Sequence, residues 1–260
     1  MIVFAQFSDT HLDGRKGRAE RAAAVVAYLN GLSMPLDAVV VTGDIADHGL
    51  PAEYEQARTI LSASRHPVFP CPGNHDTRAL YREILLGENG GADAGVPVNR
   101  VRHTAGALFA LCDSTIPGRD DGYLADETIS WLDRVLAERP DVTSFLCFHH
   151  PPAPLHVPYV DSIRQFGEHR LAALVARHPQ VVAILCGHAH TPAATTFAGR
   201  PLLVAPAVVS TVTLPWEHGD IADEQAPAAV AFHILDDQQC LTTHYRVVTC
   251  DDGPRPVRMR

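Results

Sequence analysis

Short apolar runs alternate with stretches of helical periodicity through the first two thirds of the chain. The apolar runs are rich in β-branched residues and predict strands at Ile2–Phe7, Ala38–Thr42, Val68–Pro70, Ala107–Leu111, Ser144–Phe148 and Val181–Leu185. The stretches between them predict helices at Arg18–Leu32, Ala52–Ala63, Thr77–Leu86, Asp126–Glu138 and Glu168–Arg177. Alternation of this kind is typical of parallel strand pairs that helices cover, so the pattern predicts an α/β fold.

The pattern changes after His190. Two segments are typical of β-hairpins, one turning at Ala198-Gly199 and the other at Asp236–Gln239. Residues 191–250 are therefore predicted to form an antiparallel C-terminal part. Gly87–Pro97 predicts a loop, and His149–Asp161 has too many prolines for a helix. The closing DDGPRPVRMR predicts a frayed polar tail.

Composition limits the size, the partners and the location of the protein. With 260 residues, 46% of them hydrophobic, and no clear internal boundary, we predict a single domain over residues 1–260. The net charge of −9 disfavours long nucleic acid, without excluding a small phosphorylated substrate. The chain shows no basic leader and no apolar run of about 18 residues, so we expect a cytoplasmic protein without a membrane span. The six scattered cysteines are expected to be reduced, mostly buried thiols.

Side chains that can bind metals follow five of the predicted strands: Asp9, His11, Asp44, Asn74, His149, His188 and His190. In an open α/β sheet the carboxyl ends of the parallel strands share one edge, and ligand sites form there. The pairs Asp9/His11 and His188/His190 are spaced two residues apart, and extended backbone would aim both members to one side. Gly43, Gly73 and Gly187 precede these residues, where tight turns need the conformational freedom of glycine.

The types of these side chains favour particular metals. Imidazole together with carboxylate suits Mn, Fe, Zn or Co, whereas Ca and Mg sites are built from oxygen ligands. Seven ligands exceed what one catalytic ion takes while it keeps an open position. They fit two ions about 3.5–4 Å apart with one bridging carboxylate. The sequence therefore predicts two divalent or trivalent metal ions.

The order of the motifs resembles that of a known family. The chain contains Ser8-Asp9-Thr10-His11, Gly43-Asp44, Gly73-Asn74-His75-Asp76, His149 and Gly187-His188-Ala189-His190. The order D-x-H, GD, GNH(D), H and GHxH resembles that of the calcineurin-like metallophosphoesterases. The stretches FSDTHL, GDIADHG and FHHPP look most like class III cyclic-nucleotide phosphodiesterases and their glycerophosphodiesterase relatives. The resemblance implies a four-layer α/β/β/α sandwich with two mixed β-sheets.

The resemblance also implies a role for each motif residue. One metal would be held by Asp9, His11, Asp44 and His190, and the other by Asp44, Asn74, His149 and His188, with Asp44 bridging the two. His75 matches the family's non-ligand histidine near the phosphate, and it would stabilise or protonate the leaving oxygen. His150 would be structural or would support a ligand. Asp76 would either orient His75 or cap the following helix.

The implied function is hydrolysis of a small phosphodiester, of the cyclic-nucleotide or glycerophosphodiester class, by attack of a metal-bridging hydroxide. A phosphomonoesterase, a phosphonate monoester hydrolase and a metal-binding scaffold without catalysis stay open as alternatives. A nuclease on long DNA or RNA would need a basic groove, which the acidic composition disfavours. Substrate choice is expected to lie in the loops Gly87–Pro97, His149–Asp161 and Pro215–Ala226. Relatives often form dimers or larger assemblies, which leaves a homo-oligomer open.

Other histidines and aromatic residues receive a structural interpretation first. His48 is expected in a solvated loop rather than at the edge of the pocket. His156 and His218 lie in proline-rich loops that could reach the site. Packing in the core or at an interface is preferred over stacking on a base or sugar for three aromatic residues, Tyr159, Phe166 and Trp216.

Overall fold

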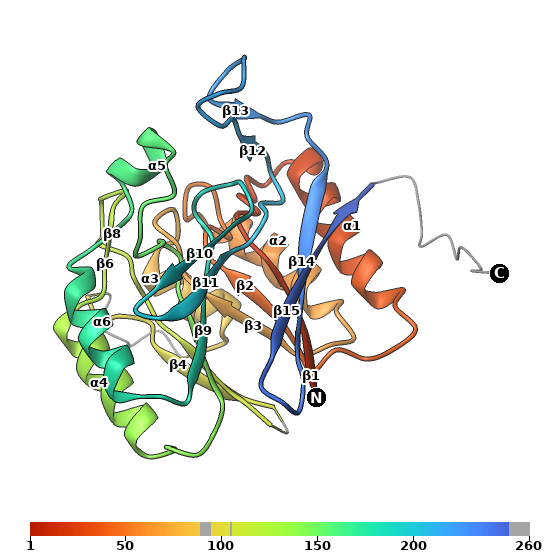
Figure 1. Cartoon of the computed structure of the whole chain (residues 1–260). Coiled ribbons are helices and arrows are strands. Elements are labelled where there is room, and N and C mark those ends of the chain that lie inside the picture. Colours follow the sequence, from red (N-terminus) through yellow and green to blue (C-terminus); the bar gives the residue numbers. More distant parts are fainter. Residues whose placement is uncertain (89–94, 105, 250–260) are drawn as a thin grey trace.

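The computed structural model describes residues 1–88, 95–104 and 106–249, and it contains two large mixed β-sheets (Figure 1). The first sheet has the order β15-β14-β1-β2-β3. Its strands are β1 (Ile2–Phe7), β2 (Ala38–Thr42), β3 (Val68–Cys71), β14 (Ala228–Leu235) and β15 (Leu241–Val248). The second sheet has the order β10-β11-β9-β7-β5-β4. Its strands are β4 (Arg100–His103), β5 (Leu108–Leu111), β7 (Ser144–Cys147), β9 (Val181–Cys186), β10 (Ala193–Phe197) and β11 (Arg200–Val204).

Helices pack on the two sheets through separate core clusters. Helices α1 (Lys16–Asn30) and α2 (Pro51–Ser62) share one cluster with Phe7 of β1, and α4 (Asp126–Ala137) and α6 (Glu168–Arg177) share another with Ile184 of β9. A third cluster joins the two sheets. Alternate residues of a strand point to opposite faces, so Phe4 enters this third cluster while Phe7 packs toward the helices. This confirms the prediction of an α/β fold with two mixed sheets.

Two helical segments differ from the prediction. The helix expected at Thr77–Leu86 consists of α3 (Arg78–Leu80) and η1 (Tyr81–Leu85), a π-helical turn in which the Leu86 N–H donates to the Tyr81 carbonyl at 3.1 Å. The prediction that His149–Asp161 holds no helix is wrong, because α5 (Pro158–Ser162) begins there. Pro158 opens this helix at the first turn, where the missing N–H is not needed.

The two predicted C-terminal hairpins are present. Strand β10 pairs antiparallel with β11, and β14 pairs antiparallel with β15. The first turn uses left-handed backbone at Ala198 and Gly199, with φ of 49° and 74°. Strand β14 also pairs antiparallel with β1, whereas β11 joins β9 in parallel. The C-terminal hairpin therefore extends the sheet that the first strand begins.

Two short strand pairs shape the loops beyond the parallel strands. Strand β6 (Gly122–Tyr123) pairs with β8 (Gln165–Phe166), and β12 (Thr211–Val212) pairs with β13 (Ala222–Asp223). Figure 1 shows α5 and the β12–β13 pair at the end of the molecule opposite the N-terminus of β1. Neither pair was predicted, because strands of two residues carry no periodic signal in the sequence.

Most of the described cysteines are buried, as predicted. Cys71, Cys112, Cys147 and Cys186 are buried and unpaired, and Cys240 is exposed. Across residues 1–88, 95–104 and 106–249, no helix is both long and apolar enough to cross a membrane. Part of the predicted loop Gly87–Pro97, Cys250 and the predicted tail at residues 251–260 lie outside the described residues.

Candidate metal centre

All seven predicted metal ligands come together where the strands of the two sheets end. Asp9 and His11 follow β1, Asp44 follows β2, and Asn74 follows β3. The second sheet contributes three further residues, His149 after β7 and His188 and His190 after β9. The Gly187 N–H donates to the His149 carbonyl at 2.9 Å and joins the loops after β7 and β9. The His188 N–H donates to Asp9 Oδ2 at 3.1 Å and joins the loops of the two sheets.

One group of ligand atoms is formed by Asp9, His11 and His190. His11 Nε2 lies 3.1 Å from His190 Nε2, and His190 Nε2 lies 3.4 Å from Asp9 Oδ1. Nδ1 of each histidine ring contacts a further side chain. Nδ1 of His11 donates to the Asp47 carboxylate at 2.9 Å, and Nδ1 of His190 lies 2.8 Å from the Ser210 hydroxyl. These contacts direct both Nε2 atoms toward the carboxylates.

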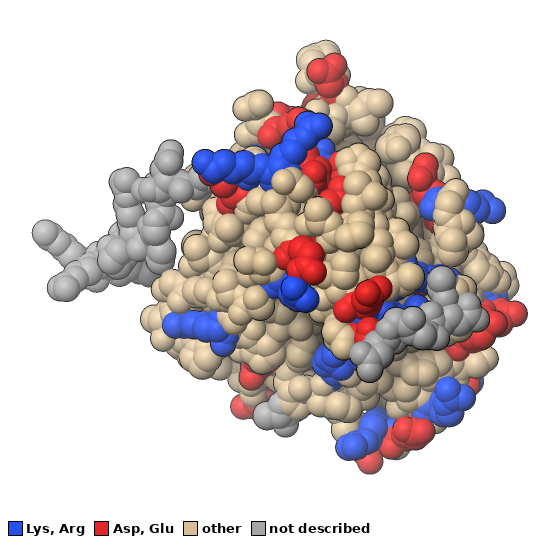
Figure 2. All heavy atoms as spheres, turned by 180° about the vertical axis from the view of Figure 1, so that it is seen from behind, with Lys and Arg blue, Asp and Glu red and all other residues tan. Residues whose placement is uncertain are grey.

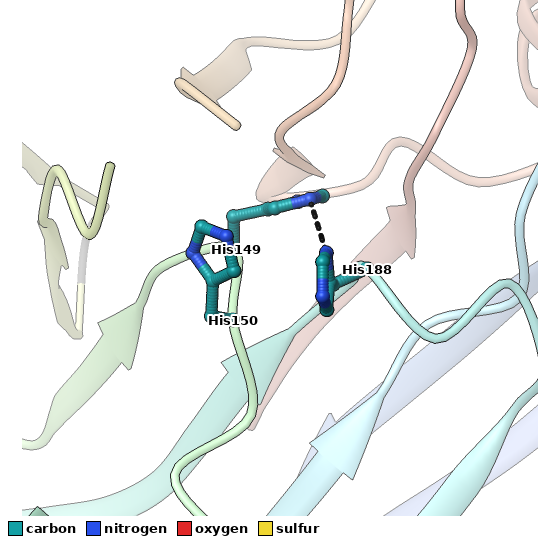
Figure 3. A group of neighbouring side chains, drawn as sticks. All are labelled: His149, His150 and His188. Carbon is teal, nitrogen blue, oxygen red and sulfur yellow. Dashed lines mark hydrogen bonds between the residues drawn. The ribbon is translucent and has the colours of Figure 1, made fainter. Parts of the chain in front are cut away.

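A second group is formed by Asp9, Asp44 and His149, with His188 beside it. His149 Nε2 lies 3.2 Å from Asp44 Oδ2 and 3.2 Å from His188 Nδ1 (Figure 3). Nδ1 of His149 donates to the Thr42 carbonyl at 2.7 Å, which fixes the ring. Asp44 Oδ2 also lies 3.5 Å from His11 Nε2, so this carboxylate faces both groups.

The donor atoms fit metal cations. Because Nδ1 of His11 and of His149 donates to an oxygen, Nε2 of each ring in its neutral form would present a lone pair to the Asp44 carboxylate. Two acceptors face each other favourably only when a cation or a proton lies between them. Asp9 Oδ1 and Asn74 Oδ1 are also buried and have no hydrogen-bond partner among the described residues. Buried polar atoms are normally paired, and binding of a metal ion would satisfy both oxygens.

The backbone at five of these residues is left-handed. Asp9, His11, Asp44, His188 and His190 have φ values of 53°, 41°, 48°, 69° and 52°. Such values are uncommon outside glycine and cluster at functional sites. The prediction that extended backbone aims each pair to one side is therefore wrong. His188 lies beside His149, whereas His190 lies with Asp9 and His11.

The glycines before the ligands act in two ways. Gly43 has a φ of 90°, as expected for a residue that needs conformational freedom. Gly73 and Gly187 are needed for close packing instead. A Cβ at Gly73 would lie 2.1 Å from Asp44 Oδ1, and a Cβ at Gly187 would lie 1.8 Å from Ser8 Oγ and 2.6 Å from the Thr42 carbonyl oxygen.

Charges within the cluster favour the protonation states that bind cations. Burial raises the pKa of Asp9, but His190 and His149 outweigh burial and lower this pKa to about 2. Burial together with the neighbouring His149 lowers the pKa of His188 to about 3. Burial also lowers the pKa of His149, but the Asp44 carboxylate outweighs it and raises this pKa to about 9. At neutral pH the carboxylates are ionised and His188 is neutral, while His149 would release a proton when a metal binds.

His75 lies beside the cluster and is exposed to the cavity. Its Nδ1 donates to the Asp47 carbonyl at 2.7 Å, and its main-chain N–H donates to Asp44 Oδ1 at 2.9 Å. Burial lowers the pKa of His75, but Asp44 and the hydrogen bond to the Asp47 carbonyl outweigh this effect and raise the pKa. Its imidazole is therefore poised to carry a proton next to the cluster.

Asp76 has neither of the two predicted roles. Its carboxylate accepts from the main-chain N–H groups of Gly73 at 2.9 Å and of Ile45 and Ala46 at 3.1 Å, and from the Tyr54 hydroxyl at 3.1 Å. No contact with His75 or with the start of α3 is among these bonds. Asp76 instead ties the loop after β2 to the loop after β3. This role was not predictable from local sequence, because most of these bonds link residues distant in the chain.

His150 lies next to His149 but points away from it toward a different loop (Figure 3). It lies near enough to His149 and His188 to form a further possible metal group with them. Both of its ring nitrogens are already engaged, with the Ser114 hydroxyl at 2.8 Å and the Asp120 carbonyl at 3.1 Å. Its pKa is well below the usual value because of burial and the neighbouring His188. A supporting role fits His150 better than metal ligation.

A cavity of about 400 Å³ opens beside the cluster. It is lined by His11, Asp44, Asn74, His75, His188 and His190, together with Asp120, Ser210 and apolar residues. Two of the loops named for substrate choice reach it, His149–Asp161 with Tyr159 and Val160, and Pro215–Ala226 with Ile221 and Ala222. His156 and His218 do not line this cavity in the described residues.

Other residues can now be placed. His48 is exposed, as expected for a solvated loop, and its ring lies 2.8 Å from the buried Glu53 carboxylate. Tyr159, Phe166 and Trp216 are all exposed, so the prediction of core packing is wrong for them.

Sequence reasoning missed Asp47, which supports both His11 and His75. The third residue after Asp44, within GDIADHG, was the signal that could have found it.

Comparisons with known proteins agree with this geometry. A sequence model of the calcineurin-like phosphoesterase family matches residues 2–192. The chain is 37% identical over 232 residues to the glycerophosphodiester phosphodiesterase GpdQ of Enterobacter lignolyticus, covering 84% of this chain and 81% of the relative. It is 32% identical over 216 residues to the 3',5'-cyclic adenosine monophosphate phosphodiesterase CpdA of Escherichia coli, covering 79% of this chain and 75% of the relative.

A solved structure shares the fold. A dimetal phosphatase from Danio rerio matches with a TM-score of 0.72 at 14% identity, over 95% of this chain and 96% of that chain. At this identity the likeness concerns the fold alone. With the family match across the strands that carry the candidate ligands, the chain belongs to the calcineurin-like phosphoesterase family of hydrolases.

Proposed function

We propose that this protein is a phosphodiesterase that holds two metal ions and hydrolyses small phosphodiesters of the cyclic-nucleotide or glycerophosphodiester class. The observation that carries the proposal is the position of Asp44. Its Oδ2 lies 3.5 Å from His11 Nε2 and 3.2 Å from His149 Nε2, between the two groups of ligand atoms. A carboxylate shared in this way is what a pair of neighbouring cations requires.

The proposed ligand sets follow the two groups. Asp9, His11, Asp44 and His190 would hold one ion, and Asp44, Asn74, His149 and His188 would hold the other. When bound, such ions supply Lewis acidity toward a phosphoryl oxygen and activation of water near neutral pH. The ligand types support Mn, Fe, Zn or Co.

The proposed catalytic residue of the chain itself is His75. Its Nδ1–H is occupied by the Asp47 carbonyl, which leaves Nε2 for a substrate oxygen. In the protonated form that its raised pKa favours, Nε2–H would donate to the leaving alkoxide and then transfer its proton. The ring packs against the ring of His11 with centroids 4.6 Å apart, which restricts its orientation.

The cavity and the surface charges support a small substrate. A volume of about 400 Å³ suits a small molecule, and no lysine or arginine lines the cavity in the described part of the chain. On the face shown in Figure 2, Lys and Arg are interspersed with Asp and Glu and form no continuous basic groove. Relatives named for glycerophosphodiester and cyclic-nucleotide hydrolysis supply the two substrate classes.

Two further proposals concern the state of the protein in the cell. The four buried, unpaired cysteines support a reducing compartment such as the cytoplasm. Trp216 and Ile221, which are 73% and 68% exposed, support contact with a second copy of the chain in a homo-oligomer.

Hydrolysis of bis(p-nitrophenyl) phosphate in the presence of Mn(II), Fe(II), Zn(II) or Co(II) tests the proposed function. We expect turnover that depends on the metal. Asp44→Ala should lose both metals by elemental analysis, and His75→Ala should keep them while kcat falls about 10²–10⁴-fold.

Three outcomes would contradict these assignments. A protein that binds two metals without turnover would be a scaffold. Faster hydrolysis of p-nitrophenyl phosphate than of the diester would indicate a phosphomonoesterase. An unchanged rate for His75→Ala would exclude its role toward the leaving group.

A further inference from the structure

A buried glutamine joins the two sheets close to the candidate metal centre. Gln6 belongs to β1, and its side chain is fully buried. Its Nε2 donates to the Thr42 hydroxyl of β2 at 3.1 Å and to the Cys186 carbonyl of β9 at 2.9 Å. Because β2 belongs to the first sheet and β9 to the second, this one amide group links both sheets. Gln6 belongs to none of the motifs that carry the candidate ligands.

His233 fixes the orientation of this amide. Its Nε2 donates to Gln6 Oε1 at 3.0 Å, and its Nδ1 lies 2.9 Å from the Thr243 hydroxyl. Since the amide oxygen of Gln6 accepts from His233, the NH2 group of the amide must face Thr42 and Cys186. The oxygen and the nitrogen of this buried side chain are therefore both paired. A buried polar network whose members are paired in this way holds its groups in one arrangement.

The two acceptors of this amide precede ligands of one proposed metal ion. Thr42 stands two residues before Asp44, and its carbonyl oxygen accepts from His149 Nδ1 at 2.7 Å. Cys186 stands two residues before His188, whose ring lies beside that of His149 (Figure 3). These ligands belong to the proposed set that takes two residues from each sheet: Asp44, Asn74, His149 and His188. This set, which would hold what we call the second ion, therefore depends on the separation of the two sheets.

The first ion, assigned to the other set, is supported by different residues. Nδ1 of His11 donates to Asp47 at 2.9 Å, and Nδ1 of His190 lies 2.8 Å from the Ser210 hydroxyl. Neither contact involves Gln6. Most ligands of this set follow strands of the first sheet: Asp9, His11 and Asp44. The separation of the sheets therefore matters less for the first ion than for the second.

We propose that Gln6 is a positioning residue that strengthens binding of the second ion and has little effect on the first. This proposal rests on the proposed function, because it assigns a support to one of the two metal ions. Residues that orient metal ligands typically change metal affinity about 10–100-fold. Gln6 acts through Thr42 and Cys186 rather than by contact with a ligand, so the lower end of that range applies.

Calorimetric titration with Mn(II) tests the proposal, and two variants assign the binding events to the two ions. Asn74→Ala should weaken binding of the second ion, because Asn74 belongs to that set alone. Ser210→Ala should weaken binding of the first ion instead, because Ser210 contacts His190, which belongs only to the first set.

Gln6→Met removes the amide and keeps the length of the side chain. We expect the Kd of the second ion to rise about tenfold and that of the first to change less than about twofold. At saturating Mn(II), hydrolysis of bis(p-nitrophenyl) phosphate should return to within about twofold of the wild-type rate, because the ligands remain. Gln165→Met is the matched control and should leave both Kd values unchanged. Gln165 is also buried, but its Nε2 donates to the Phe166 carbonyl at 2.9 Å, away from the ligands.

Thr42→Val tests the same hydrogen bond from its other end, and it decides the proposal alone if Gln6→Met does not fold. Valine lacks the hydroxyl that accepts from Gln6, while the carbonyl that holds His149 remains. The Kd of the second ion should rise. In the double variant it should rise no further than in Gln6→Met, because both substitutions remove the same hydrogen bond.

Several outcomes would overturn the proposal and leave the proposed function in place. These are an unchanged Kd of the second ion in Gln6→Met and Thr42→Val, an equal rise for both ions, a further rise in the double variant, the same rise in Gln165→Met, or a rate that stays low at saturating Mn(II). Two bound ions without turnover in the wild type would overturn only the proposed function. Fewer than two bound ions with each of Mn(II), Fe(II), Zn(II) and Co(II) would overturn both.

Discussion

The main-chain oxygen of Asp47 accepts a hydrogen bond from Nδ1 of His75 at 2.7 Å. The carboxylate of the same residue accepts from Nδ1 of His11 at 2.9 Å and pairs with Arg18 Nη1 at 2.7 Å. One residue thus orients the proposed catalytic histidine through its backbone and a proposed metal ligand through its side chain. The two functions can be separated, because a substitution removes the side chain and leaves the carbonyl.

Asp47→Ala is expected to weaken metal affinity about 10–100-fold, because His11 loses the partner that fixes its ring. At saturating metal, kcat should change little, since the carbonyl that holds His75 remains. Titration with Mn(II) monitored by activity and by calorimetry measures both quantities. Asp13→Ala is the control, because Asp13 also lies near Arg18, at 3.7 Å, but within the described residues its carboxylate makes no hydrogen bond or ion pair with His11. Unchanged metal affinity in Asp47→Ala would contradict the role of the carboxylate.

Asn74→Ala is expected to separate metal binding from folding. The buried Oδ1 of Asn74 has no hydrogen-bond partner among the described residues, so its removal should leave the Tm without metal unchanged or raised. Added metal should then raise the Tm less than it does in the wild type, because a ligand is missing. Thermal unfolding with and without Mn(II) measures both effects.

Asn99→Ala provides the matched control for this measurement. Asn99 donates to the Thr128 hydroxyl and accepts from the Asp113 N–H, each at 2.9 Å, so this variant should lower the Tm and keep the full response to metal. An equal metal-induced rise in Tm for Asn74→Ala and the wild type would exclude Asn74 as a ligand.

Gly187→Ala is expected to destabilise the protein by about 3 kcal/mol or more. The added Cβ would lie 1.8 Å from Ser8 Oγ and 2.6 Å from the Thr42 carbonyl oxygen, which belongs to the backbone and cannot rotate away. Gly199→Ala is the comparison, because Gly199 has a φ of 74° but no atom within 4 Å of a Cβ there. It should cost only about 1–2 kcal/mol through backbone strain. Urea unfolding would contradict the close-packing role if both variants lost equal stability.

His233 is expected to make the protein less stable as the pH falls below neutrality. The ring is buried, with Nε2 donating to Gln6 Oε1 at 3.0 Å and Nδ1 lying 2.9 Å from the Thr243 hydroxyl. Burial lowers the pKa of His233 from 6.5 to about 3. Between these two values the unfolded chain binds a proton that the folded chain does not. The free energy of unfolding therefore falls by up to about 1.4 kcal/mol per pH unit in this window.

The variant His233→Gln should show a shallower loss of stability between pH 6.5 and 4 than the wild type. Urea unfolding at several pH values gives the two slopes. His103→Gln, at an exposed histidine, should keep the slope of the wild type. Identical slopes for His233→Gln and the wild type would show that His233 does not carry this pH dependence.

The parts of the fold that were predictable are those that local sequence determines. Val39, Val40 and Val41 are buried, and such β-branched runs identify a central strand without further information. Strand β4 (Arg100–His103) was missed because its sequence is mostly polar, which an edge strand tolerates. Helix α5 was missed because proline was expected to prevent a helix, whereas Pro158 lies in the first turn and begins one.

The site divides in a similar way. The placement of Asp44 and His149 directly after strands was sufficient to predict that they meet. The left-handed backbone at Asp9 and the contacts of Asp76 were not predictable, because both depend on loops that come together only in the folded protein. The hydrogen bond from His150 Nε2 to the main-chain oxygen of Asp120 likewise forms only when two separate loops are folded together.

Strand β1 lies between β2 and β14, and Ile2 stands opposite Leu235. One side of this strand can pair as soon as β2 has been synthesised, but the other must wait until β14 has been synthesised. Until then an apolar edge that precedes Asp9 and His11 is open to pairing with other nascent chains. Completion of the catalytic end is thereby tied to the synthesis of β14, and products truncated before β14 would be prone to aggregate rather than to act as partial enzymes.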